Sequence, residues 1–410
     1  MSEVIGTSRR GVLAGAGALA LLGGLGGLLG GCGRDSAAAS AKTKIGWIEP
    51  KTGRLAAAYA PIYVGGRLAL DDIKQAGGLL GEPVSMNEVD DEGSPATQST
   101  IARRILGAGP TFVVGPTGSS QVVASATALA REPIVQSGWG GTASLGDGKQ
   151  FPFFYQLVYN TTQQAHAAMT FLKEVRNCAK IGLIVENSEF GKSIKNASVE
   201  FLASEYSTKA VAVETFEVDA NDMTPFVRNL ASAGVDGLGL FTGQPQATIL
   251  ILRAMQAGGM APTIVSHDLN YVEALGEFSG ELLGKFFGTT YRGLTYTATE
   301  QPSKRVSELA KRIVEHPQTA GLGYSAITSP YYDWVTLMAA VIEEEKTADP
   351  AKLKKALDSL SGYGGVRSRI TFTADNHSGI DKGDITIGTL TSALEPESLG
   401  GVLRRRADGL

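Results

Sequence analysis

The side chains best suited to chemistry are His267 and its neighbour Asp268, in the stretch SHDLNY. An imidazole beside a carboxylate can act as a general base, so one interpretation is a hydrolase that uses this pair. Such an enzyme also needs a nucleophile, and the sequence contains no G-x-S-x-G, no C-x-x-C and no P-loop lysine motif. Its four histidines form no H-x-x-x-H pair. We therefore expect no catalytic residue, no cofactor and no metal site.

Binding is the better interpretation of the polar residues that follow predicted strands. Ser119 begins a predicted helix in GPTGSSQ, where free N–H groups and the helix dipole favour an anion. The alternative is that Ser119 only caps the helix, and the same choice applies to Thr142 in SGWGGTASL. Asp268 is either a ligand contact or a turn residue, and Trp139 either walls a pocket or packs beneath it.

Strand and helix signals alternate along two stretches of the chain. Short apolar runs typical of strands buried on both faces occur in KIGWIE, TFVVG and KIGLIVE. Between such runs lie helical patterns, for example STIARRIL, which places Ile101 and Ile105 on one face. The alternation predicts an α/β fold with two doubly wound, Rossmann-like lobes.

The boundaries of the lobes follow from the late part of the chain. Two predicted helices, in YDWVTLMAAVIEEE and KLKKALDSL, have no strand between them and cannot build a third sheet. We expect a first lobe of residues 44–160 plus 291–372 and a second of residues 161–290 plus 373–394. Residues 395–410 have no apolar period and are expected to form a tail.

The N-terminal segment predicts export. Residues 11–31 carry no charge, and nine of these 21 are glycine, which weakens a permanent helix. Arg9 and Arg10 resemble a twin-arginine export motif, and LGGC resembles a lipobox in which Cys32 becomes lipidated. We expect a signal peptide over residues 1–31, a flexible tether over residues 32–43, and a lipid anchor on the outer face of the cytoplasmic membrane. The alternative is an uncleaved anchor.

Charge and cysteine content narrow the possible partners. The formal net charge of −4 makes nucleic acid a poor candidate. Cys178 is the only cysteine besides Cys32. If Cys32 is acylated, no intrachain disulfide can form, and stability must come from packing.

One succession of motifs resembles a known family. It runs PKTG, LALDDIKQAGGLLG, DDEGSPATQ, VVGPTGSSQVVASATALAREPIVQSGWGGTASL and KIGLIVENSEFGKS. Its order and spacing, over about residues 44–390, resemble the type I periplasmic binding proteins, specifically the leucine/isoleucine/valine-binding family of ABC importers. The resemblance implies two lobes joined by a hinge, which close on a small solute and present it to a membrane permease. It favours a branched-chain or other small apolar amino acid, with urea, short amides or aromatic acids as alternatives.

The resemblance also implies ligand contacts on the first lobe. Ser119 matches the serine that holds the ligand carboxylate. Gly140 and Thr142 match the backbone and hydroxyl contacts to the α-carboxylate and α-amino groups.

On the second lobe, Asp268 falls where the family has a glutamate that pairs with the ammonium. Phe190 matches an aromatic residue, usually tyrosine, that lies over the ligand. Tyr59 comes one position after the place of a large aromatic residue, and Trp139 has no assigned counterpart. These departures affect the identity of the ligand more than its binding.

Overall fold

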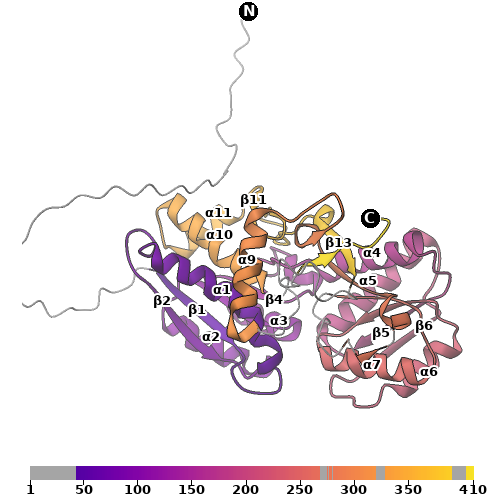
Figure 1. Ribbon diagram of the computed structural model, residues 1–410. Helices are drawn as coiled ribbons and strands as arrows, with labels where there is room; N and C mark the ends of the chain where they lie inside the picture. The colour runs from indigo at the N-terminus through magenta and orange to yellow at the C-terminus, as the bar shows by residue number, and fades with distance from the viewer. Residues whose placement is uncertain (1–42, 268–274, 276, 279, 320–327, 390–402) are drawn as a thin grey trace, which may run out of the picture.

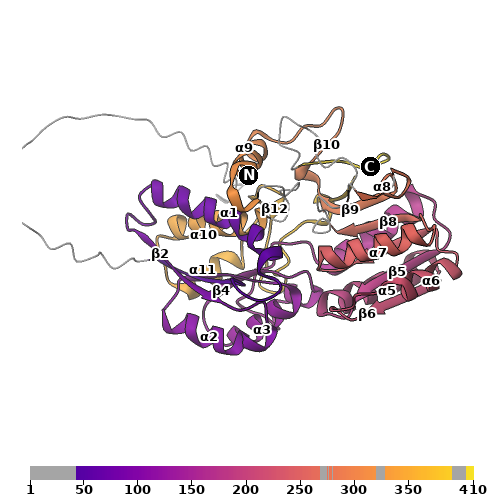
Figure 2. The ribbon, with the colours of Figure 1, turned by 60° about the horizontal axis from the view of Figure 1, so that its bottom comes forward.

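The computed structural model describes residues 43–267, 275, 277–278, 280–319, 328–389 and 403–410. Two α/β lobes lie side by side (Figures 1 and 2). The sheet of the first lobe has the order β2-β1-β3-β4, and all its neighbouring strands are parallel. Its strands are β1 (Thr43–Glu49), β2 (Val84–Asp90), β3 (Phe112–Thr117) and β4 (Val135–Trp139).

The sheet of the second lobe has the order β13-β9-β8-β7-β5-β6. The strands β5 to β9 are parallel to one another, and β13 runs antiparallel to β9. The predicted α/β class with parallel sheets is confirmed. The strands are β5 (Ile181–Glu186), β6 (Ala212–Phe216), β7 (Gly237–Phe241), β8 (Thr263–His267), β9 (Phe286–Tyr291) and β13 (Ile385–Thr389).

Helices cover both faces of each sheet (Figures 1 and 2). In the first lobe, α1 (Ala56–Gln75) and α10 (Ser329–Glu345) pack on one face, and α2 (Gln98–Gly107) and α3 (Ser119–Leu129) on the other. In the second lobe, α4 (Thr161–Thr170) packs with α5 (Glu189–Tyr206), and α6 (Thr224–Ser232) with α7 (Pro245–Ala257). The remaining helices are α8 (Gly280–Leu283), α9 (Lys304–Glu315) and α11 (Pro350–Leu357).

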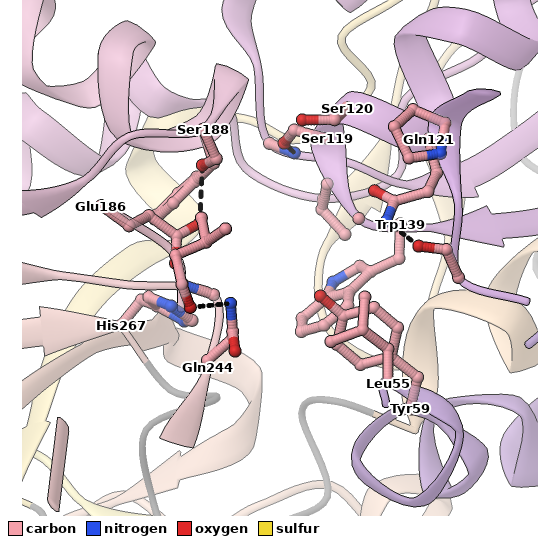
Figure 3. Close-up of a pocket in the computed structure, with 18 of the residues that line it drawn as sticks. Leu55, Tyr59, Ser119, Ser120, Gln121, Trp139, Glu186, Ser188, Gln244 and His267 are labelled. Atoms are coloured by element: carbon pink, nitrogen blue, oxygen red, sulfur yellow. Dashed lines mark hydrogen bonds between the residues drawn. The ribbon is translucent and has the colours of Figure 1, made fainter. Parts of the chain in front are cut away.

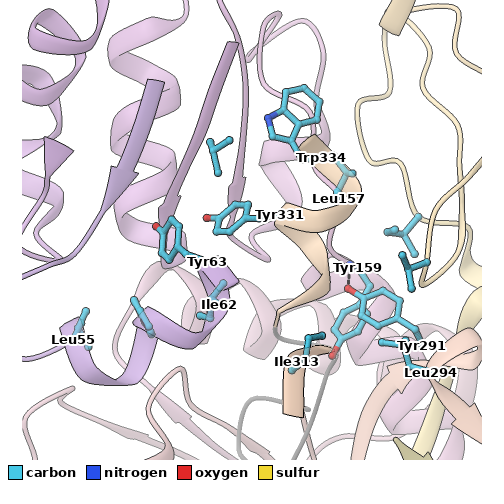
Figure 4. Packing of buried hydrophobic residues seen from close by; sticks show 14 of the residues in the cluster. Leu55, Ile62, Tyr63, Leu157, Tyr159, Tyr291, Leu294, Ile313, Tyr331 and Trp334 are labelled. Carbon is cyan, nitrogen blue, oxygen red and sulfur yellow. Dashed lines mark hydrogen bonds between the residues drawn. The ribbon is translucent and has the colours of Figure 1, made fainter. Parts of the chain in front are cut away.

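The late helix α10 returns to the first lobe and approaches α1 closely. A Cβ atom on Gly65 would overlap the Thr328 carbonyl oxygen, and one on Gly66 would lie 2.9 Å from atoms of Trp47 and Tyr331. Small residues at these two positions therefore allow the contact. Tyr331 of α10 then stacks near Tyr63 of α1, with 4.7 Å between the ring centroids (Figure 4).

Three chain segments connect the two sheets, and they are tied to one another. The segment after β4 contacts the end of β9, from which the second segment continues, where the Tyr159 backbone N–H donates to the Tyr291 hydroxyl at 3.2 Å. The same segment contacts the one before β13 where Asn160 Nδ2 donates to Ser378 Oγ at 3.2 Å. The aromatic rings of Tyr159 and Tyr291 lie together at this junction (Figure 4).

The C-terminal end differs from the expected tail over residues 395–410. In its described part, β14 (Arg404–Arg405) pairs in parallel with β10 (Thr295–Tyr296). Leu403 is fully buried, and Arg406 Nη1 donates to the Glu300 carboxylate at 2.7 Å. The segment is held because its apolar side chain has a core to enter and its arginine has an acceptor.

A second small ladder joins β11 (Tyr363–Gly364) to β12 (Arg369–Ile370).

In the part of the chain that the structure describes, no helix is both long enough and apolar enough to cross a membrane.

Candidate functional site

A cavity of about 320 Å³ lies between the carboxyl ends of strands from both lobes. This is where parallel α/β sheets bind ligands, because the loops there enter helix N-termini. Figure 3 shows the two walls facing each other, with Ser119, Ser120, Gln121, Trp139, Leu55 and Tyr59 on one side and Glu186, Ser188, Gln244 and His267 on the other.

The N-terminus of α3 supplies the polar part of the first-lobe wall. Gly118 precedes the helix with φ of +98°, a conformation that side-chain-bearing residues rarely adopt. Ser119 is the first helical residue, and its Oγ accepts a hydrogen bond from the Gly141 backbone N–H at 3.0 Å. Since the oxygen is the acceptor, the Ser119 hydroxyl proton can be donated to a ligand. Together with the helix N–H groups, this gives that end of the cavity chemistry that suits an anion.

Aromatic and apolar side chains complete the first-lobe wall. The Trp139 backbone N–H donates to the Tyr331 hydroxyl at 3.1 Å, which holds the end of β4 in place. The Trp139 indole lines the cavity, as do Leu55 and Tyr59. Burial raises the pKa of the Tyr59 phenol, and the nearby Glu186 charge raises it further. Tyr59 therefore stays a neutral hydroxyl at physiological pH.

Glu186 is the charged group of the second-lobe wall. It is the last residue of β5, and only 5% of its surface is exposed. Its Oε2 accepts from Thr242 Oγ1 at 2.8 Å and from the Gly243 backbone N–H at 2.9 Å. Its Oε1 accepts from Ser188 Oγ at 2.6 Å, and the same Ser188 oxygen caps α5 by accepting from Gly191 N–H. All three donors to the carboxylate are neutral.

Phe190 and His267 form the aromatic part of this wall. Their rings meet edge to face with centroids 5.2 Å apart. His267 Nε2 lies 2.6 Å from the Thr242 carbonyl oxygen, to which it donates. This bond sets the orientation of the imidazole. The neighbouring Asp268 lies outside the described residues.

One hydrogen bond crosses the cavity directly. Arg54, which precedes α1, donates from Nη1 to Gln244 Oε1 at 2.7 Å, and both side chains line the cavity. Tyr159 and Tyr291, at the junction of the connecting segments, also line it. The two lobes thus contact each other around the cavity at its polar rim and at its base.

Comparison with known proteins identifies the family. The family model described as "Periplasmic binding protein" matches residues 42–390. The chain belongs to the periplasmic binding protein family. Among its relatives, the Leu/Ile/Val-binding protein homolog 1 of Brucella suis is 25% identical over 325 residues, which cover 79% of this chain and 84% of the relative. The leucine-, isoleucine-, valine-, threonine- and alanine-binding protein of Pseudomonas aeruginosa is 23% identical over 317 residues, which cover 77% of this chain and 81% of the relative.

Solved structures share the fold of this periplasmic binding protein. A type 1 periplasmic binding protein from Bordetella pertussis superposes with a TM-score of 0.75 at 20% identity, covering 85% of this chain and 96% of that one. A branched-chain amino acid transporter substrate-binding protein from Streptococcus pneumoniae, solved in complex with isoleucine, superposes with a TM-score of 0.71 at 20% identity and the same coverage.

The structure brings four of the predicted site residues together. Ser119, Trp139, Phe190 and Tyr59 all line the cavity. Gly140 and Thr142 do not, although Gly141 between them does. The carbonyl oxygens of Gly140 and Thr142 accept from the buried Gln156 amide at 2.8 and 3.2 Å, and the Thr142 hydroxyl, the group predicted to contact the ligand, is buried with no hydrogen-bond partner among the described residues. Asp268 and the predicted lipidation site Cys32 lie outside the described residues.

Sequence reasoning did not select several residues that line the cavity, among them Glu186, Arg54, Gln121 and Gln244. One signal was available for Glu186: it is the only ionisable residue of the buried strand IGLIVE, and it stands at the carboxyl end. Arg54 and Gln244 are 190 residues apart in sequence, and no local pattern relates them. Among the described residues, no cluster of three or more His, Cys, Asp or Glu side chains could hold a metal ion.

Proposed function

We propose that the protein binds a small amino acid with an apolar side chain and delivers it to an ABC permease. The observation that carries this proposal is the N-terminus of α3, with Ser119, opposite an aromatic and apolar surface inside a cavity lined by both lobes. The helix end suits a carboxylate. Leu55, Tyr59 and Phe190 suit an apolar side chain. The relatives are named as proteins that bind leucine, isoleucine and valine, and such ligands agree with this chemistry.

The alternative ligands fit the cavity less well. Urea or a short amide carries no anion for the helix end, and a ligand that small would leave much of the aromatic wall without contacts. An aromatic acid would use the helix end but has no cationic group for the carboxylate of Glu186. A hydrolase built on His267 is not favoured, because the chain belongs to a family of binding proteins and its named relatives bind amino acids.

We further propose that the chain is exported and lipid-anchored through Cys32. The support is the twin-arginine segment followed by the LGGC sequence. Acyl chains contribute about 0.8 kcal/mol per buried CH₂, so two or more hold a protein stably on a membrane. Cys32→Ala should move the protein from the membrane fraction to the soluble fraction. An unchanged membrane fraction, together with an unacylated wild-type N-terminus, would contradict the anchor.

Two measurements test the ligand proposal. Mass spectrometry of the molecules released from freshly purified protein should detect a branched-chain or similar amino acid. Titration calorimetry with L-leucine, L-isoleucine, L-valine, urea, acetamide and 4-hydroxybenzoate should then rank the three amino acids first. Turnover of any of these compounds at a useful rate would reject a function limited to binding.

The chain offers a matched control for this titration. A Cβ on Gly141 would point at the Phe190 ring at 3.6 Å, so Gly141→Leu should fill the cavity and abolish binding. Gly107→Leu adds the same side chain at a position where no neighbouring atom lies within 4 Å of the added Cβ. This variant should bind the ligand like wild type. Equal binding by both variants would place the ligand elsewhere.

A further inference from the structure

The carboxylate of Glu186 is buried without a positive partner. Its hydrogen-bond donors are the Ser188 and Thr242 hydroxyls and the Gly243 N–H, and no Lys or Arg among the described residues forms an ion pair with it. Arg54 lines the same cavity, but its guanidinium donates to Gln244. Buried carboxylates are costly unless they are both hydrogen-bonded and paired with a positive charge. Glu186 has the hydrogen bonds and lacks the charge.

Those residues after position 43 that lie outside the described ranges add no basic side chain either. By sequence, residues 268–274, 276, 279, 320–327 and 390–402 contain no Lys, Arg or His. Of the basic residues that line the cavity, Arg54 donates to Gln244 and His267 donates to the Thr242 carbonyl. A cationic molecule in the cavity can supply the positive charge that Glu186 lacks. A carboxylate has about four acceptor sites, and the three hydrogen bonds leave one more for such a partner.

We infer that Glu186 binds a cationic group of the ligand, which makes the ligand a zwitterion. This rests on the proposed function. The carboxylate of the ligand would lie at the N-terminus of α3, and its primary ammonium would lie against Glu186 on the opposite wall. Each lobe then supplies the charge complementary to one end of the ligand, so the full interaction exists only when the lobes hold the ligand between them.

A purely structural role for Glu186 is the competing explanation, because its hydrogen bonds join the end of β5 to the loop after β7. Measuring variants of Glu186 with two ligands, one with an ammonium group and one without, distinguishes the structural role from the binding role. The ligand pair is L-leucine and its 2-hydroxy acid, 2-hydroxy-4-methylpentanoate, which keeps the carboxylate and side chain but replaces the ammonium. The protein variants are Glu186→Gln, which removes the charge, and Glu186→Asp, which keeps it.

Glu217→Gln is the matched control. Glu217 lies on the same lobe, is exposed, and accepts hydrogen bonds from Asn187 Nδ2 at 3.0 and 3.1 Å. It does not line the cavity. Its substitution removes one negative charge near the site and reports any long-range electrostatic effect.

We expect Glu186→Gln to weaken leucine binding by about a hundredfold or more, since it leaves a ligand ammonium unpaired in a closed cavity. Binding of the hydroxy acid should change by less than about threefold, and Glu217→Gln should change neither ligand by more than that. Glu186→Asp should recover a large part of the leucine affinity. Calorimetry gives the affinities, and circular dichroism melts show whether each variant is folded.

Equal losses for leucine and its hydroxy acid in Glu186→Gln would overturn the inference and leave a structural role. So would a Glu186→Gln protein that binds leucine like wild type. If Glu186→Gln does not fold, wild type and Glu186→Asp still decide: wild type that binds the hydroxy acid as tightly as leucine refutes a cation site. If wild type binds no amino acid at all, the proposed function fails, and this outcome is distinct from the others.

Discussion

The ion pair between Asp333 and Arg367 is buried next to the cavity. We expect its loss to destabilise the fold more than the loss of an exposed ion pair. Both side chains are almost completely buried, at 1% exposure, and Asp333 Oδ2 lies 3.0 Å from Arg367 Nε. Asp333 Oδ1 also accepts from the Val366 N–H at 2.7 Å. Arg367 Nη1 donates to the hydroxyl of Tyr291, and the guanidinium stacks on that ring at 4.7 Å. Because Tyr291 lines the cavity, the ion pair supports one of its walls.

Asp333→Asn should lower the free energy of unfolding by about 3 to 5 kcal/mol. The asparagine oxygen can still accept from Val366 N–H, but its NH₂ group would face the Arg367 guanidinium, donor against donor. An arginine keeps its proton in proteins, so the buried positive charge would remain without a counterion. A loss of this size is a large fraction of the total stability of a typical protein.

Urea unfolding followed by circular dichroism measures the effect, with Asp72→Asn as the control. Asp72 accepts from both terminal nitrogens of Arg312 at 2.8 Å, but the two side chains are 44% and 38% exposed. An exposed pair of this kind contributes about 0.2 to 1 kcal/mol. If Asp333→Asn costs no more than Asp72→Asn, burial does not control the strength of these ion pairs and the reasoning is refuted.

Three further predictions concern the cavity and its surroundings. Ser119→Ala removes a hydroxyl donor to an anionic ligand, so calorimetry should show a loss of about 1.5 to 3 kcal/mol in binding free energy; an unchanged affinity would remove Ser119 from the site. Arg54→Met deletes the hydrogen bond to Gln244 across the cavity, about 0.5 to 1.5 kcal/mol, so affinity should fall by no more than about tenfold; a larger loss would indicate that Arg54 contacts the ligand. Burial raises the pKa of Asp91 above its ordinary 3.8, so the folded protein binds this proton more tightly than the unfolded chain, and stability falls as pH rises from 3.8 through the raised value. Asp91→Asn should remove this loss of stability with rising pH. Urea unfolding of wild type and Asp91→Asn between about pH 3 and 7 measures it, and the same pH dependence for the two proteins would contradict the prediction.

Local sequence patterns predict the elements of this fold well. The apolar runs KIGWIE and KIGLIVE became the fully parallel strands β1 and β5, and the serine of GSSQ became the first residue of α3. Periodicity of apolar residues is a short-range property, and it determines which face of an element is buried. The position of Ser119 follows in turn, because the carboxyl ends of parallel strands meet at one edge.

The contacts around the cavity were less predictable. The contacts of Gly140 and Thr142 to a ligand stay predictions. Their carbonyl oxygens accept from the Gln156 amide, and this arrangement depends on where another segment lies. The C-terminal end was expected to be a tail because its arginine-rich sequence has no apolar period. It is held by pairing with β10, more than 100 residues earlier in the chain.

The sequence by itself therefore determined the order and type of the elements, the edge of each sheet at which a ligand can bind, and Ser119 at one helix end. Only the tertiary structure decided which polar groups face one another across the cavity and which of them have a partner. Glu186 illustrates the difference: a carboxylate at the end of a strand is visible in the sequence, but its burial among neutral donors is not. Whether a charge is compensated depends on every segment packed around it, and those segments are brought together only by folding.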